Sequence, residues 1–163
     1  MKVSAQEEYG LRCLLQLARR QQAGNHRPLT LSEIARGEGL SVANVAKLIR
    51  GLRKAGLVAS VLGRTGGYSL TRAADRISVA EALHALGGKL YDPDYCTKFA
   101  GDLKVCSHMG DCSIRSLWGV LEGLIERVLE KTMLSELIGS ERGVAAALDD
   151  RAPAAMEGIR GCR

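Results

Sequence analysis

Three cysteines in the second half of the chain have the types and spacing of metal ligands. Cys96, Cys106 and Cys112 form a Cys-x9-Cys-x5-Cys pattern. Structural zinc sites usually contain a close pair of cysteines with two to four residues between them, and this pattern has no such pair. Iron-sulfur clusters are held by cysteine thiolates at more varied spacings. The pattern therefore favours an iron-sulfur cluster over zinc, and three unliganded loop cysteines are the alternative.

Three thiolates leave such a cluster one ligand short. His108 lies between the second and third cysteines and is one candidate for the fourth ligand, and carboxylates on the first predicted helix are others. Cys112 directly precedes a predicted helix, whose N-terminal end carries a partial positive charge. A flexible loop that ends at this helix could bring the three sulfur atoms to one centre.

The two other cysteines are expected to have different roles. Cys13 falls among apolar residues of a predicted helix and is expected in the core, whereas Cys162 lies near the end of the chain and is expected to be free. An odd total of five argues against a disulfide framework. No Cys-x-x-Cys pair or arrangement of cysteine and base is visible, so the sequence does not predict an enzyme.

The positive charge of the chain is concentrated in its first half. Residues 1–75 contain 12 lysines and arginines against 5 acidic residues, whereas the remainder contains 11 against 13. A basic half beside a slightly acidic one indicates a module that binds a polyanion, joined to a segment with another task. The alternative is an ordinary solvated basic face.

Three helix starts are marked by a serine or threonine followed three residues later by glutamate, a pair that satisfies two free backbone N–H groups. The pairs are Ser4 with Glu7, Thr30 with Glu33, and Ser78 with Glu81. After the second helix, residues 37–41 form a short glycine-containing turn, and Ser41 caps a helix predicted over 42–55. The sequence thus predicts a helix-turn-helix.

The second helix of this pair has one apolar and one basic face. Residues 45, 48, 49 and 52 are apolar and share one side, while Lys47, Arg50 and Lys54 share the other. Strands are then predicted over 57–62 and 68–71, around the basic, glycine-rich tip 63–67. A hairpin in this position is a wing. The fold class expected is mainly α with a small β-hairpin, a winged helix-turn-helix.

Helix-turn-helix proteins contact base edges with the start of their second helix and phosphates with basic side chains. Asn44 could pair with adenine and Lys47 with guanine. The predicted contacts to bases are made by Ser41, Ala43, Asn44 and Lys47. The predicted contacts to phosphates or the minor groove are made by Arg50, Lys54, Arg64 and Thr65.

The C-terminal half contains one long amphipathic helix, predicted over 113–131 and followed by a short helical turn over 133–138. Its continuous apolar stripe predicts a dimerisation helix, and packing against its own domain is the alternative. The expected organisation is a winged helix-turn-helix domain at 1–88, a cysteine-bearing cluster loop at 89–112, the dimerisation segment at 113–138, and a mobile tail at 139–163.

No stretch of the sequence has the roughly 20 apolar residues of a membrane span, and the N-terminus lacks the apolar segment of a secretory signal. We therefore expect a cytoplasmic protein without a membrane partner.

Several segments resemble the Rrf-type family of bacterial winged helix-turn-helix transcription regulators, which includes IscR-like, NsrR-like and RsrR-like iron-sulfur regulators. The resemblance covers about residues 1 to 138. Its specific segments are 8–12 (EYGLR), 52–58 (LRKAGLV) running into 66–70 (GGYSL), 77–82 (ISVAEA), and the three cysteines before the long helix.

The resemblance implies a homodimer on a pseudo-palindromic operator in double-stranded DNA. It also implies an iron-sulfur cluster that senses redox state, nitric oxide, or the supply of iron or clusters, and that thereby controls binding by a DNA-binding transcription regulator, expected to be a repressor. The alternative is a clusterless or zinc-bound regulator of the same fold that senses thiol oxidation or a partner protein.

The resemblance also bears on the fourth ligand. IscR-like members have a histidine shortly after the third cysteine, where this chain has the segment 114–116 (IRS). NsrR-like and RsrR-like members use a carboxylate on the first helix of the other subunit, which corresponds to Glu8. The resemblance implies Glu8 of the partner subunit as the fourth ligand, with His108 as the alternative.

Two departures from the family pattern leave the cluster type open between 2Fe-2S and 4Fe-4S. Arg12 stands where RsrR-like members have a histidine, and the gap between Cys96 and Cys106 is longer than in IscR-like or NsrR-like members.

Overall fold

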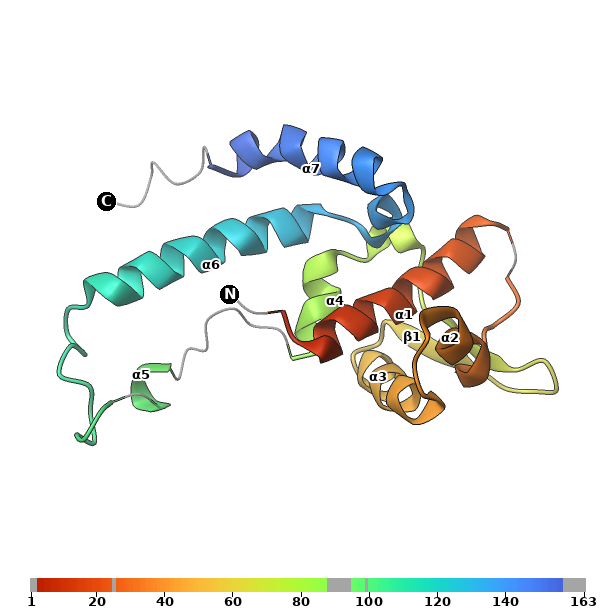
Figure 1. Cartoon of the computed structure of the whole chain (residues 1–163), viewed down its shortest axis with the longest axis horizontal. Helices are drawn as coiled ribbons and strands as arrows, with labels where there is room; N and C mark the ends of the chain where they lie inside the picture. The colour runs from red at the N-terminus through yellow and green to blue at the C-terminus, as the bar shows by residue number, and fades with distance from the viewer. Residues whose placement is uncertain (1–2, 25, 88–94, 99, 157–163) are drawn as a thin grey trace.

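The computed structural model describes residues 3–24, 26–87, 95–98 and 100–156. In this part of the chain the protein is mainly helical with one small hairpin (Figure 1). In chain order the elements are α1 (Ala5–Gln22), α2 (Leu31–Glu38), α3 (Val42–Lys54), β1 (Val58–Val61), β2 (Gly67–Leu70), the 3-10 helix η1 (Ala74–Arg76), α4 (Val79–Ala85), α5 (Tyr95–Lys98), α6 (Ser113–Lys131), the 3-10 helix η2 (Leu134–Ile138) and α7 (Glu141–Met156).

The three predicted capping boxes are confirmed at the starts of α1, α2 and α4. In the first of them, the Ser4 hydroxyl accepts a hydrogen bond from the Glu7 N–H at 3.2 Å, and the Ser4 N–H donates to the Glu7 carboxylate at 2.6 Å. Each box satisfies N–H groups that a helix start otherwise leaves without an intrahelical partner. The chain therefore sets these three helix boundaries locally.

The turn between α2 and α3 depends on Gly39, which has the left-handed backbone conformation (φ +66°) that favours glycine. The Leu40 N–H donates to the Ala35 carbonyl at 2.9 Å across this turn. The apolar face of α3 packs into a core shared with α1 and α2, and its buried residues are Val45, Leu48, Ile49 and Leu52. The predicted helix-turn-helix is thus confirmed.

The wing is an antiparallel hairpin in which Val58 pairs with Leu70 and Val61 with Gly67. Its second strand also forms a β-bridge with the segment before α2, where the Leu29 and Tyr68 backbones exchange hydrogen bonds of 2.8 and 3.0 Å. A side chain on Gly67 would lie 2.6 Å from the Leu29 carbonyl oxygen. Glycine therefore permits this close approach, which anchors the wing to the helical core.

The chain returns to the core after α6. The Val79 N–H donates to the Thr132 carbonyl at 2.8 Å, and the Leu134 N–H donates to the Ile77 carbonyl at 2.8 Å. Leu134 is fully buried in the same core cluster as the helix-turn-helix residues. The core that supports the helix-turn-helix thus includes a residue from beyond the long helix.

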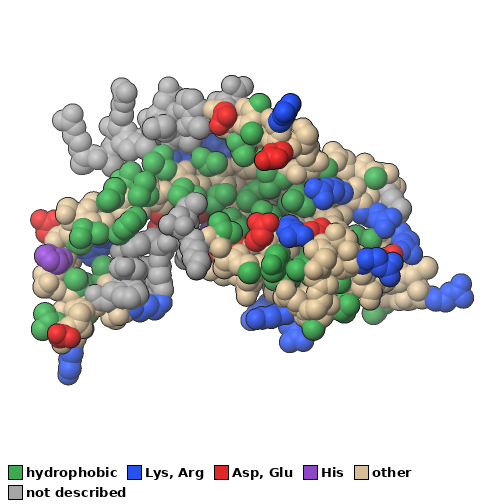
Figure 2. Space-filling model, viewed as in Figure 1, with side chains coloured by type: hydrophobic (Ala, Val, Ile, Leu, Met, Phe, Trp, Pro, Cys, Tyr) green, Lys and Arg blue, Asp and Glu red, His purple; other side chains and the backbone are tan. Residues whose placement is uncertain are grey.

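The N-terminal half of α6 carries large apolar side chains that remain exposed in the single protomer. They are Ile114, Leu117, Trp118, Val120 and Leu121. Figure 1 shows α6 extending away from the helices around α1, and Figure 2 shows hydrophobic side chains gathered along it. The C-terminal half of α6 is half-buried and contacts α4 and α7.

The tail from residue 139, which the sequence predicts to be mobile, contains the helix α7 at residues 141–156, beside α6 (Figure 1). The Ser140 hydroxyl accepts a hydrogen bond from the Gly143 N–H at 3.3 Å and begins this helix. Val144 and Leu148, one helical turn apart, are half-buried. An alanine-rich helix needs few apolar contacts because alanine has a high helix propensity. Two apolar residues are too few to give a recognisable helical period in the sequence.

Within the described ranges, no helix is both long and apolar enough to cross a membrane.

Candidate DNA-binding surface and cysteine loop

Burial on one side of α3 determines which of its side chains face outward. Ser41 caps the helix by accepting a hydrogen bond from the Asn44 N–H at 3.2 Å. Because the apolar side is fixed in the core, Lys47, Arg50 and Lys54 are exposed together on the opposite side. We call these three residues the basic face of α3. In the described part of the protein none of them forms an ion pair, so their charges are available to a polyanion.

The structure leaves the predicted DNA-contacting residues accessible. The exposed members are Ser41, Ala43, Lys47, Arg50, Lys54, Arg64 and Thr65, and Asn44 is half-buried. Arg64 and Thr65 lie in the turn of the wing, where the Gly66 N–H donates to the Gly63 carbonyl at 2.9 Å. The start of α3, its basic face and the wing tip are the surfaces with which a winged helix-turn-helix contacts DNA.

An ion pair that the sequence did not reveal holds α1 to the helix-turn-helix. The Arg12 guanidinium donates to the Glu38 carboxylate at 2.7 Å and to the Glu38 carbonyl at 2.8 Å. It also lies over the Tyr9 ring, 5.6 Å from the ring centroid. Glu38 is the last residue of α2, so this contact fixes the end of α2 just before the turn to α3. The two residues are 26 positions apart, beyond the reach of local sequence patterns.

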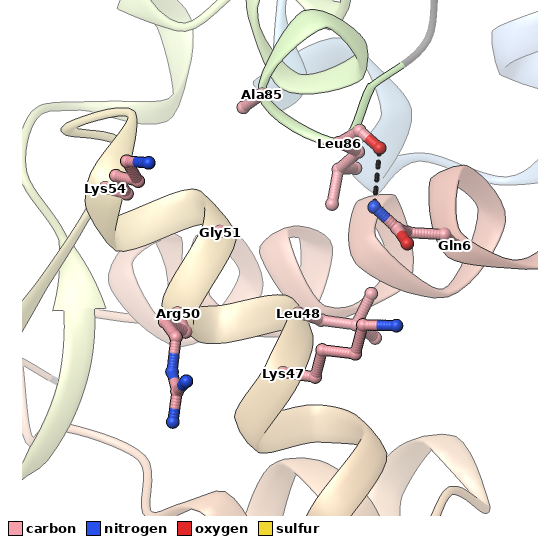
Figure 3. Close-up of a pocket in the computed structure, with 8 residues that line it drawn as sticks. All are labelled: Gln6, Lys47, Leu48, Arg50, Gly51, Lys54, Ala85 and Leu86. Atoms are coloured by element: carbon pink, nitrogen blue, oxygen red, sulfur yellow. Dashed lines mark hydrogen bonds between the residues drawn. The ribbon is translucent and has the colours of Figure 1, made fainter.

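A cavity of about 240 Å³ lies between the start of α1, the basic side of α3 and the end of α4 (Figure 3). Its lining residues are Gln6, Lys47, Leu48, Arg50, Gly51, Lys54, Ala85 and Leu86. On the side opposite α3, the Gln6 side-chain amide donates a hydrogen bond of 2.7 Å to the Leu86 carbonyl. The sequence gave no signal for this cavity, because its three walls come from separate segments.

The cysteine loop contains a short helix that the sequence did not predict, α5, on which Cys96 lies. Cys112 caps α6, because its sulfur atom accepts a hydrogen bond from the Arg115 N–H at 3.4 Å. The Arg115 side chain folds back onto the loop and donates to the Met109 carbonyl at 2.9 Å. All three candidate cysteine ligands are half-buried. The end of the loop is thus attached to the start of α6.

The donor chemistry of the loop fits an iron-sulfur cluster, but the arrangement in one protomer does not. Among the described residues, no three histidine, cysteine, aspartate or glutamate side chains are placed to hold a metal ion together. His108 and Cys112 line one small cavity with Asp111, whereas Glu8 is exposed on α1. The structure therefore does not bring the three cysteines and either proposed fourth ligand to one centre.

Cys13 lies where the sequence predicted, in the core between α1 and its neighbours, with no exposed surface. Burial, and to a smaller extent the nearby Glu38 carboxylate, raise the pKa of its thiol to about 11. A thiol in this environment stays protonated and inert. The expectation for Cys162 falls outside the described residues.

Comparisons with known proteins agree with this architecture. A family model named Rrf2, described as an iron-dependent transcriptional regulator, matches residues 3–140. The protein rrf2 of Nitratidesulfovibrio vulgaris is 35% identical over 138 residues, which cover 85% of this chain and 87% of the relative.

Two solved structures show the same fold. IscR of T. potens superposes with a TM-score of 0.65 at 32% identity, over 85% of this chain and 86% of its own. CymR of B. subtilis, described as the global cysteine regulator, superposes with a TM-score of 0.67 at 28% identity, over 85% of this chain and 96% of its own. With its winged helix-turn-helix and the match over almost all of its described residues, the chain belongs to the Rrf2 family of transcriptional regulators, a family of regulators rather than enzymes.

Proposed function

We propose that the protein is a transcriptional repressor that reads its operator with the start of α3 and holds the DNA backbone with the basic face of α3 and the wing tip. The observation that carries this proposal is the basic face itself, whose three exposed cations lie opposite a buried apolar side and form no ion pair with any described residue. Asn44 and Lys47 would contact bases, and Arg50, Lys54, Arg64 and Thr65 would contact phosphates or the minor groove.

Two DNA-binding domains would act together in a dimer. The exposed apolar side chains of α6 support a homodimer in which this helix packs against its copy, and a two-fold dimer would require a pseudo-palindromic operator. Such a regulator would act in the cytoplasm, where the DNA is.

The DNA-binding proposal is tested by selecting bound duplexes from a random pool and then measuring their affinity by fluorescence anisotropy. Lys47→Ala is expected to cost about 1–3 kcal/mol at one base position, because a base contact is lost. Arg50→Ala is expected to weaken all sequences similarly and to reduce the slope of log affinity against log salt by about 1.

Arg142→Ala removes an exposed arginine of α7 and is the matched control, which is expected to bind like the wild type. Wild-type protein that selects no sequence, or Lys47→Ala protein with unchanged preference, would contradict the proposed reading surface.

We further propose that the cysteine loop controls DNA binding by holding an iron-sulfur cluster, of the 2Fe-2S or 4Fe-4S type. Cys96, Cys106 and Cys112 would supply three ligands, and Glu8 of the partner subunit or His108 the fourth. The family description as iron-dependent and the likeness to IscR support this proposal. When bound, the cluster would supply a group that responds to redox state, nitric oxide or iron supply.

Because one protomer does not gather these ligands, loading would require the loop to rearrange or a second subunit to contribute. This requirement favours a ligand from outside the loop, such as the carboxylate of the partner's Glu8. In that arrangement the sensor would touch the first helix of the other DNA-binding unit.

A second candidate keeps the fold and changes the signal. The chain resembles CymR about as well as it resembles IscR, with TM-scores of 0.67 and 0.65. In this alternative the loop holds no cluster, or holds zinc, and responds to thiol oxidation or to a partner protein. The half-buried loop thiols and the absence of a gathered ligand set among the described residues favour this candidate.

Anaerobic reconstitution with iron and sulfide, followed by metal analysis and native mass spectrometry, separates the two. A cluster regulator is expected to yield coloured dimers with iron and acid-labile sulfide, and Cys106→Ala to lose the colour. Cys162→Ser is the control that should keep it. Colourless wild-type protein after reconstitution would exclude the cluster, and stoichiometric zinc would favour the alternative.

Comparison of two further variants assigns the fourth ligand. If the carboxylate of the partner's Glu8 is a ligand, Glu8→Ala alters the absorption spectrum while His108→Ala leaves it unchanged. The reverse result would assign His108.

A further inference from the structure

Two residues near the start of α1 hold the point at which the chain leaves the DNA-binding core for the cysteine loop. That point is Leu86, the C-cap residue of α4. The Gln6 amide donates a hydrogen bond of 2.7 Å to the Leu86 carbonyl, although the two residues are 80 positions apart (Figure 3). The bond satisfies a carbonyl at the end of α4 that has no partner within the helix. Gln6 therefore attaches the end of α4 to α1.

Gly10 provides the seat for the Leu86 side chain. A methyl group on Gly10 would lie 2.4 and 2.5 Å from the two terminal carbons of Leu86 and 2.9 Å from its branch carbon. Leu86 is only 4% exposed in this position. A helix interior disfavours glycine by about 1 kcal/mol relative to alanine, so the packing of Leu86 supplies a physical reason for glycine here.

The seated leucine faces the DNA-reading helix. Gln6, Ala85 and Leu86 form one side of the 240 Å³ cavity, and Lys47, Leu48 and Gly51 of α3 lie across it. The cavity is partly open to solvent, since Lys47, Arg50 and Lys54 along it are exposed, and it leaves Leu86 room to move from its place on Gly10. A leucine that moved into it would press on the side of α3 that carries Lys47.

We propose that Gln6, Gly10 and Leu86, together called the Leu86 latch, transmit the state of the cysteine loop to α3. The proposal rests on the proposed function, in which that loop is the sensor. The cysteine loop, residues 89–112, follows Leu86 closely in the sequence and ends where Cys112 caps α6. With its far end attached to α6, a change in the loop pulls or releases Leu86, and the leucine carries the change across the cavity. Gln6 and Gly10 are positioning residues that set the resting place of Leu86.

The test uses full-length protein with Cys162→Ser, so that the remaining accessible thiols lie in the loop. Reaction with N-ethylmaleimide changes the loop without any metal. Anisotropy of a selected duplex is measured before and after reaction, together with hydrogen exchange of the peptide that spans α3. Wild type is expected to change its DNA affinity by at least about fivefold, the lower range of allosteric couplings.

Gln6→Met keeps the length of the side chain but removes the donor, and is expected to reduce the change to within about twofold while melting like the wild type. Gly10→Ala is expected to displace Leu86 and to fix one affinity in both states. Because Gly10→Ala alters the core and could fail to fold, Gln6→Met is the deciding variant. Gln22→Met, at the exposed end of α1, is the matched control and is expected to switch normally.

The outcomes separate the latch from the sensor. A wild type that switches together with a Gln6→Met variant that switches equally overturns the latch and leaves the proposed function intact. If maleimide leaves DNA affinity unchanged, the sensor function fails and hydrogen exchange decides the latch. Exchange in α3 that changes in the wild type and not in Gln6→Met supports it, and exchange that is unchanged in the wild type overturns it.

Discussion

Cysteines in two kinds of surroundings show how position determines the chemistry of one side chain. Cys13 is completely buried on α1, and burial raises the pKa of its thiol to about 11. Cys112 is half-buried, and its sulfur accepts a backbone hydrogen bond at the start of α6. A thiolate is the reactive form, so burial and the raised pKa both make Cys13 unreactive, whereas Cys112 is accessible in part.

We predict that Cys13 escapes alkylation while the protein is folded. With a pKa of about 11, only about one Cys13 thiol in ten thousand is ionised at neutral pH, and no reagent can reach it. Peptide mass spectrometry after brief treatment with N-ethylmaleimide is expected to find label on Cys96, Cys106 and Cys112 at least about a hundredfold faster than on Cys13, because Cys13 is both buried and protonated. Denatured protein is the control, in which Cys13 is expected to react as well. Early labelling of Cys13 in the folded protein would show that α1 opens.

At the scale of single elements, the start of α2 illustrates how a few hydrogen bonds define a helix. The Thr30 N–H donates to the Glu33 carboxylate at 2.8 Å, the Thr30 hydroxyl donates to it at 2.9 Å, and Arg27 forms an ion pair with it. These contacts, led by the backbone hydrogen bond, hold the pKa of Glu33 below its ordinary value. The helix that precedes the turn to α3 therefore depends on an ionised glutamate.

We predict that Thr30→Ala lowers the free energy of unfolding by about 1 kcal/mol, the usual cost of losing a cap. Glu33→Gln is expected to show a pH-dependent loss. Since the folded pKa of Glu33 is depressed, its contribution is present above the pKa of the unfolded state and disappears as pH falls through the folded pKa.

Urea denaturation of wild type and Glu33→Gln at neutral and acidic pH measures this effect. Glu122→Gln, on α6 and outside any capping box, is the control. A difference between wild type and Glu33→Gln that stays constant into acid would show that the carboxylate charge contributes nothing to α2.

The elements that the sequence predicts well are those with local signals. Ser4, Thr30 and Ser78 each have a capping partner three residues away. Apolar residues recur at helical spacing along the whole of α6, so the sequence predicts the bounds of this helix closely. The helix α7 was missed because Val144 and Leu148 are its only half-buried side chains among residues 141–149. The high helix propensity of its alanines favours a helix, but it produces no periodic pattern of apolar residues.

The candidate site likewise contains features that local sequence patterns predict and features that they do not. The basic face of α3 could be predicted, because Lys47, Arg50 and Lys54 follow the helical period opposite an apolar side. The contacts from Arg12 to Glu38 and from Gln6 to Leu86 could not, because tertiary packing brings distant segments together. Cysteine spacing indicated the chemistry of the loop, but spacing alone does not determine where three side chains converge.

At the scale of the whole molecule, the exposed half of α6 is the feature that one protomer leaves incomplete. Leu117 and Trp118 are 54% and 43% exposed, and Ile114 is 61% exposed. A run of large apolar side chains on one helix marks an interaction surface. The C-terminal half contacts α4 and α7, so among the described residues the exposed half beside the cysteine loop is left for a partner.

We predict that Leu117→Asp weakens dimerisation about a hundredfold, because about 1.4 kcal/mol of apolar burial is lost at each of the two copies of the site. Sedimentation equilibrium over a concentration series measures the dissociation constant. Leu62→Asp makes the same change on the 94% exposed leucine of the wing and is the control for dimerisation. Equal dimerisation by Leu117→Asp and wild type would move the interface away from α6.

The return of the chain after α6 has a consequence for how such regulators diversify. Backbone hydrogen bonds pair Val79 with Thr132 and Ile77 with Leu134, so the segment before α4 and the segment after α6 are joined at the core. The cysteine loop and α6 together therefore form an arm, a segment inserted into the DNA-binding domain, and backbone hydrogen bonds at the core hold the place where it is inserted. An arm of this kind can be lengthened, shortened or exchanged without redesign of the DNA-reading core. Replacing the arm between residues 87 and 132 with that of another family member would change the signal to which the protein responds and preserve the DNA sequence that it binds.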